Sequence, residues 1–191
     1  MTEAIASAAT SRNDLVKVAA GGIVSGVATP LMVPLLDRLD LFPGQLRIAL
    51  LALPFAILVF VLVRRFSQNP LWAALAAGVI SMFAFVCAVN AAIWVDGQVV
   101  HFDKLASNLL SGLAGGFSGA TVMALGIRML PAGPRDAHLW LPMVIVGTIA
   151  GSLLALDNAL NLDMTSVLYP VWQAGVGVTL ARALQQAKPD R

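Results

Sequence analysis

The chain has 191 residues, of which 59% are hydrophobic and only 12% are charged. Because a soluble domain carries about 25% charged residues, a water-soluble fold of this size could not cover so much apolar surface. The formal net charge is +2, and the twelve lysines and arginines are scattered instead of gathering on one face, so we expect no nucleic-acid partner. The composition predicts an integral membrane protein in a lipid bilayer, with residues 1–191 forming one transmembrane domain.

The apolar residues fall into segments that are each long enough to cross a hydrocarbon core of about 30 Å as a helix. The first is far longer than the apolar core of a signal peptide, so we expect it to stay uncleaved as an anchor. Trp72 and Trp94 bracket the third and are expected at the two membrane interfaces. The predicted fold class is all-α, a polytopic bundle of six transmembrane helices at about 14–38, 46–63, 71–95, 105–130, 139–156 and 165–184.

The basic residues indicate the orientation of this bundle. Nine of the twelve lysines and arginines fall on the side that holds both termini, and the other three are Arg38, Arg47 and Lys104. Cytoplasmic loops retain an excess of positive charge, so we expect both termini in the cytoplasm. The uncleaved first segment, the compact loops and this charge bias favour a bacterial inner membrane.

Glycines recur at a four-residue interval within the apolar segments. Small residues at this spacing let two helix backbones approach closely, which is how helices associate in lipid. We expect them to pack the bundle internally, although the same faces could serve a homo-oligomer or a larger membrane complex. The pairs are Gly22 with Gly26, Gly112 with Gly116, Gly115 with Gly119, and Gly147 with Gly151.

The first segment also contains Pro30 and Pro34, which predict a kink or a local break in that helix. Ser25 and Thr29 could satisfy the backbone groups that such a break would free. A broken helix at this position could line a cavity.

Two pairs of segments share short sequence patterns. Residues 20–29 resemble residues 114–121, and residues 71–79 resemble residues 168–176. A duplication of three helices would place the second copy upside down, as in the inverted repeats of many transporters, with the solute path between the repeats. The alternative is chance, because a chain rich in alanine, glycine, leucine and valine readily produces such similarities.

Gly116-Phe117-Ser118-Gly119 resembles the Gly-x-Ser-Gly signature around the nucleophile of the rhomboid intramembrane proteases. The resemblance covers these four residues. It implies a histidine on the sixth helix, because a serine hydroxyl needs a neighbouring base, but the histidines of this chain are His101 and His138, in connectors. We therefore expect no protease activity, and we expect Ser118 to pack in a glycine-rich helix contact.

We expect neither a cofactor nor a metal site. Two separated histidines and Cys87, which lies within an apolar segment, cannot make a zinc site. The loop after the fifth segment carries Asp157, Asn158, Asn161 and Asp163, which could bind a cation weakly. The favoured interpretation of this loop is an acidic connector in which Asp163 caps the sixth helix.

No predicted segment carries an acidic, basic or histidine side chain at mid-depth, and proton relays and ion-coupled pumps ordinarily use such groups. We therefore expect the protein not to be an enzyme. Gln173, near the middle of the sixth segment, would either hydrogen-bond a neighbouring helix or line a solute path. The candidate path residues are Ser25, Thr29, Ser118, Thr121 and Gln173.

Two functional hypotheses follow from the sequence. The first is a small transporter or facilitated-permeation protein for an uncharged or weakly polar solute, indicated by the repeat and by the neutral polar residues. The alternative is a noncatalytic membrane subunit or scaffold of a larger complex, indicated by the glycine faces and by the uncharged mid-depth positions.

Overall fold

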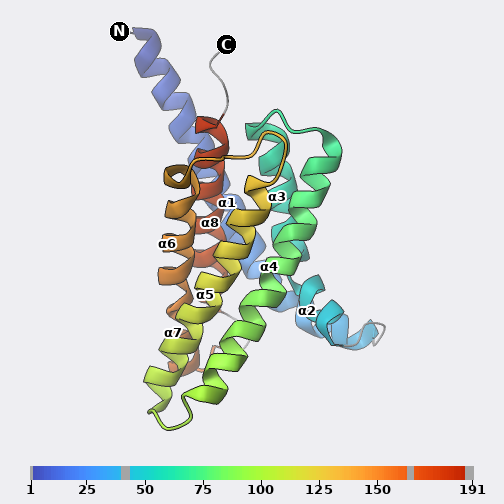
Figure 1. Ribbon diagram of the computed structural model, residues 1–191, viewed down its shortest axis with the longest axis vertical. Helices are drawn as coiled ribbons and strands as arrows, with labels where there is room; N and C mark the ends of the chain where they lie inside the picture. Colours follow the sequence, from blue (N-terminus) through green and yellow to red (C-terminus); the bar gives the residue numbers. More distant parts are fainter. Residues whose placement is uncertain (1, 40–43, 163–165, 188–191) are drawn as a thin grey trace.

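The structure is a computed structural model that describes residues 2–39, 44–162 and 166–187. Within these ranges the chain forms eight helices and no strand (Figure 1). The helices are α1 (Thr2–Leu39), α2 (Gln45–Leu51), α3 (Leu53–Phe66), α4 (Leu71–Gln98), α5 (Lys104–Arg128), α6 (Ala137–Gly151), α7 (Leu153–Ala159) and α8 (Leu168–Gln186).

Four helical stretches are long and apolar enough to cross a membrane: Arg12–Arg38, Leu71–Gln98, Lys104–Arg128 and Ala137–Ala159. The pair α2 and α3 would make a fifth crossing, bent by 56°. The all-α prediction for a membrane-embedded protein is thus consistent with the structure. The sixth predicted segment forms α8, which is not among the stretches that reach this apolar content, so the count of six stays a prediction.

The long helices run alternately up and down the bundle (Figure 1). The start of α1 and the end of α8 lie at one end, which we call the terminal end, together with the connectors 67–70 and 129–136. The opposite end, which we call the far end, holds the turn at 99–103 between α4 and α5. The most extensive packing joins α4 with α5 and α1 with α8, and α5 lies between α4 and α6.

The expected break in the first segment is not observed, because α1 is one helix that includes Pro30 and Pro34. The interrupted helices are the second and fifth predicted segments. Pro54 lacks the N–H that would continue α2 into α3, and the chain bends at Ala52. The interruption between α6 and α7 falls at Ser152, whose hydroxyl donates to the carbonyl of Ile149 at 2.7 Å.

The paired glycines do pack the bundle internally, as expected. A Cβ atom at Gly112 or Gly116 would lie less than 3.0 Å from the backbone of α6 at Gly151 or Gly147. A Cβ atom added at Gly22 or Gly26 would lie equally close to the backbone of α8. The third face, Gly115 with Gly119, packs on alanines of α4. Every one of these faces is therefore occupied by a helix of the same chain.

The terminal half of the bundle is densely packed. Its core side chains come from α3, the start of α4, and the ends of α5 and α8, and the fully buried members include Val59, Val63, Ala73, Ala77, Met123 and Leu180. Asn69, also buried, accepts a hydrogen bond from the Ala132 N–H at 2.9 Å and so joins the two connectors of the terminal end. A salt bridge of 2.8 Å between Asp14 and Arg65 joins α1 to α3 there.

Replacing Gly116 by alanine should destabilise the protein, because the added methyl group would collide with the backbone of α6 instead of with a flexible side chain. Overpacking of this kind costs about 1 to 3 kcal/mol. We expect Gly116→Ala to lower the free energy of unfolding by that amount in mixed micelles, followed by circular dichroism. Gly97→Ala is the control, since nothing lies within 4 Å of its added Cβ. Equal stability of the two variants would contradict this account of the α5–α6 contact.

Candidate functional site

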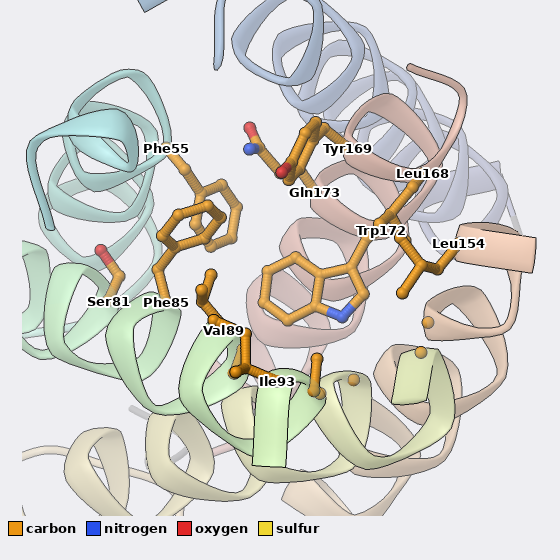
Figure 2. Close-up of a pocket in the computed structure, with 16 residues that line it drawn as sticks. Phe55, Ser81, Phe85, Val89, Ile93, Leu154, Leu168, Tyr169, Trp172 and Gln173 are labelled. Atoms are coloured by element: carbon orange, nitrogen blue, oxygen red, sulfur yellow. The ribbon is translucent and has the colours of Figure 1, made fainter. Parts of the chain in front are cut away.

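A cavity of about 240 Å³ lies between the helices of the two halves of the chain (Figure 2). Its walls come from α3 and α4 in the first half and from α5 to α8 in the second. Phe55, Ser81 and Gln173 are buried, as are the lining glycines, whereas Ile93, nearer the far end, is exposed. The full lining is Phe55, Ser81, Phe85, Ala88, Val89, Ala92, Ile93, Gly112, Gly115, Gly116, Gly151, Leu154, Leu168, Tyr169, Trp172 and Gln173.

Four aromatic rings form much of the wall. Phe55 and Trp172 meet edge to face with centroids 5.5 Å apart, and Phe85 and Tyr169 are tilted at 6.0 Å (Figure 2). The indole of Trp172 packs against Gly147 of α6, which has no side chain to crowd the ring. A Cβ atom added at Gly147 would lie only 3.3 Å from Trp172 Nε1. The small residues of α5 and α6 thus determine where this ring sits.

Gln173 connects the cavity to α1. Its Oε1 accepts a hydrogen bond of 2.7 Å from the Ser25 hydroxyl, and its Nε2 donates one of 2.8 Å to Thr29 Oγ1. The Thr29 hydroxyl in turn donates to the backbone carbonyl of Ser25 at 3.0 Å. All three side chains are buried, at 6%, 1% and 2% exposure for Ser25, Thr29 and Gln173. Gln173 therefore bonds a neighbouring helix, as one of its two expected roles requires, and it also lines the cavity; its place on a solute path stays a prediction.

The structure brings three of the five candidate path residues together and leaves two apart. Ser118 donates a long hydrogen bond of 3.5 Å to the carbonyl of Cys87 on α4. The Thr121 hydroxyl is buried without a hydrogen-bond partner among the described residues. Of the five, Gln173 alone is part of the cavity lining, with Ser25 and Thr29 bonded behind it, and whether any of the five contacts a moving solute stays a prediction.

Sequence reasoning missed most of the lining. Tyr169, Trp172 and Gln173 are spaced i, i+3 and i+4, so they share one face of α8, and this pattern could have been recognised. Ser81 and Phe85 are likewise four residues apart on α4. They were not distinguishable from ordinary lipid-facing or core residues, because a purely apolar helix gives no contrast between its faces.

Asp157, on α7, caps the start of α8. Its carboxylate accepts hydrogen bonds from the N–H groups of Val167 at 2.9 Å and Leu168 at 3.2 Å, and from the Ser166 hydroxyl at 2.5 Å. A negative charge also stabilises the positive end of the helix dipole. The cap predicted for the sixth helix thus exists but is made by Asp157, while Asp163 lies outside the described residues.

This capping role uses both carboxylate oxygens of Asp157, so they are not held ready for a cation. Among the described residues no group of three histidine, cysteine or acidic side chains is placed to hold a metal ion. His101 lies in the far-end turn and His138 begins α6 at the terminal end, so the structure separates them along the bundle.

A second, more polar hollow of about 660 Å³ opens at the far end, and we call it the vestibule. The Ser107 hydroxyl donates to the Asp96 carboxylate there at 2.7 Å, joining α4 to α5. Its lining is Asp96, Val99, Val100, Phe102, Lys104, Leu105, Ser107, Asn108, Ala155, Asn158, Ala159 and Asn161. The vestibule therefore shares α4, α5 and α7 with the cavity.

Comparisons of the chain with protein-family models, with curated proteins and with solved structures found no match. The function has to be inferred from the cavity, the vestibule and the helices that form them.

Removing the Asp157 carboxylate should destabilise the α7–α8 junction. In Asp157→Ala two backbone N–H groups of α8 lose their acceptor, and an unsatisfied buried donor costs about 1 to 3 kcal/mol. We expect a loss of that size in the free energy of unfolding. Asp136→Ala is the control, because Asp136 precedes α6 without making a side-chain capping hydrogen bond. The role assigned to Asp157 is wrong if both variants lose the same stability.

The hydrogen bond between Ser25 and Gln173 should be visible in a double-mutant cycle. Interhelical hydrogen bonds in membranes couple by about 0.6 kcal/mol on average and up to about 1.7. We expect Ser25→Ala and Gln173→Ala to show a coupling energy in this range. Ser25→Ala with Thr179→Val should show none, since the Thr179 hydroxyl bonds only to carbonyls of its own helix. Zero coupling for the first pair would mean that the network does not hold α1 to α8.

Proposed function

We propose that this protein is a small transporter or facilitated-permeation protein for an uncharged or weakly polar solute. The observation that carries the proposal is the cavity between the two halves of the chain, with the Gln173 amide at its buried end. Ligand sites in proteins are concave, mostly apolar and equipped with a few polar groups that orient the ligand. The cavity has this composition, since Ser81 and Gln173 are set among aromatic and aliphatic side chains.

The two ends of the bundle are packed differently: the far half is hollow and the terminal half is filled. A transporter whose binding site is open to one side only needs such a difference. The far half contains the cavity and the vestibule, and the terminal half is filled by buried side chains such as Met123 and Leu180. A solute could reach the cavity from the far end but could not leave at the terminal end. Alternating access needs one such state with the site sealed on one side.

The packing of the helices supports an inverted repeat of α1–α4 and α5–α8. Exchanging the two halves converts the α1–α8 contact into the α5–α4 contact, and these are the two most extensive in the protein. The same exchange converts α3–α4 into α6–α8, which pack to the same extent. The agreement is partial, because the contact between α5 and α6 is larger than its counterpart between α1 and α3.

We further propose that α8 is the sixth crossing and that the terminal end is cytoplasmic. The helix α8 runs alongside α1 over most of the bundle (Figure 1), although it is less apolar than the other crossings. Its polar Gln173 is satisfied by α1, which lowers the cost of placing it in lipid. Seven of the ten basic residues that the structure describes belong to the terminal end, which is the bias that the positive-inside rule expects of the cytoplasmic side. A bacterial inner membrane suits this arrangement.

The alternative is a noncatalytic subunit of a larger complex. One argument for it was that the glycine faces could bind a partner. The glycine pairs that could have bound a partner or a second copy are covered by α4, α6 and α8 of the same chain. A stable complex would have to use the apolar outer surface, which a membrane protein exposes to lipid in any case. Purification in mild detergent separates the two functions, because a subunit should copurify with its complex.

The proposal is tested by flux into proteoliposomes that contain the purified protein and a panel of labelled neutral solutes, including polyols, sugars, amides and aryl glycosides. We expect at least one solute to enter faster than into protein-free vesicles. Gln173→Leu should reduce that flux about tenfold, the effect of roughly 1.4 kcal/mol at the site. Gln186→Leu, the same change at the exposed end of α8, should leave it unchanged. If the whole panel enters no faster than into empty vesicles, the transport proposal is rejected.

A further inference from the structure

We infer that the solute is an uncharged amphipathic aromatic molecule, with one or two rings in the cavity and a hydroxyl- or amide-bearing end in the vestibule. This inference rests on the proposed function, since it names the class of solute that the same site would bind. It follows from the size of the cavity, the chemistry of its walls and its position next to the vestibule.

The size of the cavity limits its occupant to a small ring system. A cavity of about 150 Å³ lined by leucine, isoleucine and phenylalanine binds benzene. At about 240 Å³ the present cavity is large enough for one ring with substituents or for two fused rings. The polar end of a larger solute would have to lie outside it.

The walls favour an aromatic and uncharged occupant. Rings of Phe55, Phe85 and Trp172 face the hollow in Figure 2, and aromatic pairs gain from edge-to-face and offset contacts beyond the burial of area. The described lining contains no carboxylate, ammonium, guanidinium or imidazole group. A charged ring substituent would lose its hydration there without gaining a counter-ion, which is strongly unfavourable.

The buried end of the cavity can recognise one polar substituent on the ring. An amide nitrogen carries two N–H donors, and among the described residues Gln173 Nε2 uses one of them, for Thr29. The Ser81 hydroxyl donates to the carbonyl of Gly78 at 2.7 Å, which leaves its oxygen able to accept. One acceptor or donor on the ring is therefore matched.

The cavity and the vestibule are consecutive along three helices. On α5 the lining runs from Gly112 in the cavity to Asn108 in the vestibule, a step of four residues on one face. On α4 the corresponding step is from Ala92 to Asp96, and on α7 Leu154 lines the cavity while Asn158 lines the vestibule. The two hollows are thus adjacent along the bundle, the apolar one deeper and the polar one toward the far end, and a solute that occupies both would bridge them.

The vestibule suits hydroxyl or amide groups. Asn108, Asn158 and Asn161 each offer a carbonyl oxygen and an NH₂ group, so they can bond groups that both donate and accept. The charges of Asp96 and Lys104 are opposite in sign, so the vestibule does not favour an ion of either sign. A lipid acyl chain would match the cavity but would make no hydrogen bond to these amides.

The inference is tested by isothermal titration of the protein in nanodiscs with phenyl β-glucoside, which has a ring and a neutral polyhydroxyl end. We expect binding of one molecule per protein. Methyl β-glucoside, which lacks the ring, and benzoate, which replaces the sugar by a charge, should bind at least about tenfold more weakly. Equal binding of methyl β-glucoside or of benzoate would overturn the assignment of the solute class.

Two variants on α4 locate the binding. Phe85→Leu removes a ring from the cavity wall. It should lower the affinity of the protein for phenyl β-glucoside about three- to tenfold. Phe83→Leu makes the same change two residues away, at a side chain that is 60% exposed and outside the lining, and should leave the affinity unchanged. Equal affinities in the two variants would place the ligand elsewhere, in the lipid or on the surface, and would overturn the inference.

The titration needs no flux, so the two proposals fail separately. Binding of phenyl β-glucoside, with no solute of the panel entering proteoliposomes faster than empty vesicles, would reject transport and retain the ligand class. Flux of another neutral solute without binding of phenyl β-glucoside would retain transport and reject the ligand class.

Discussion

The close approach of α4 and α6 to the glycine faces of α5 is the constraint on which the rest of the structure depends. The pairs Gly112 with Gly116 and Gly115 with Gly119 are offset by three residues, which corresponds to a rotation of about 60° around the helix axis. The two neighbours of α5 therefore pack on adjacent faces. Because glycine has no side chain, the backbones of α4 and α6 occupy the space that a Cβ would fill, and Gly112, Gly115 and Gly116 also contribute to the cavity lining.

Polar groups then define the shape of this space. In lipid a buried polar side chain needs a partner, and Gln173 obtains its partners from Ser25 and Thr29. This requirement helps to hold α8 against α1, and it directs the face carrying Tyr169 and Trp172 toward α4 and α5. At the start of the same helix, Asp157 supplies acceptors for N–H groups that have no partner within α8. The wall of the cavity formed by α8 is thus fixed at two points.

Features that depend on a local pattern could be predicted from the sequence. The glycine intervals predicted internal helix contacts, and the structure confirms them. Gln173 was expected to bond a neighbouring helix, and it does so. Of the kink or break expected in α1, the break is not observed, because Pro30 and Pro34 lie within a continuous helix, whereas Pro54 coincides with an interruption. Whether a proline interrupts a helix depends on the neighbours that pack around it, and one sequence does not contain these.

The cavity could not be predicted in the same way, since its lining is assembled from six helices that are distant in the sequence. Apolar residues that line a hollow, fill a core or face lipid are chemically alike, so Phe85 and Phe83 are distinguished only by the packing of α4 against its neighbours. The cap on α8 was placed at Asp163 for a related reason. An acidic residue shortly before a helix is the usual cap; Asp163 lies outside the described residues, and the carboxylate that the structure shows at the start of α8 is that of Asp157.

The two interrupted helices give the transport proposal a structural route between states. Both short pieces, α2 and α7, lie toward the far end of the bundle (Figure 1), so the helices beside the cavity can bend there without disturbing the packed terminal half. Release of a solute at the terminal end would instead require that end to separate. The described polar contacts that join its elements are the Asn69 bond to Ala132 and the salt bridge of Asp14 with Arg65. Exposed ion pairs contribute little, of the order of 0 to 1 kcal/mol, so the buried apolar core between α3, α5 and α8 is the main barrier to opening. A transport cycle would have to offset the exposure of that core with new contacts at the far end, where α7 borders both hollows and apolar surface of the cavity is available for burial.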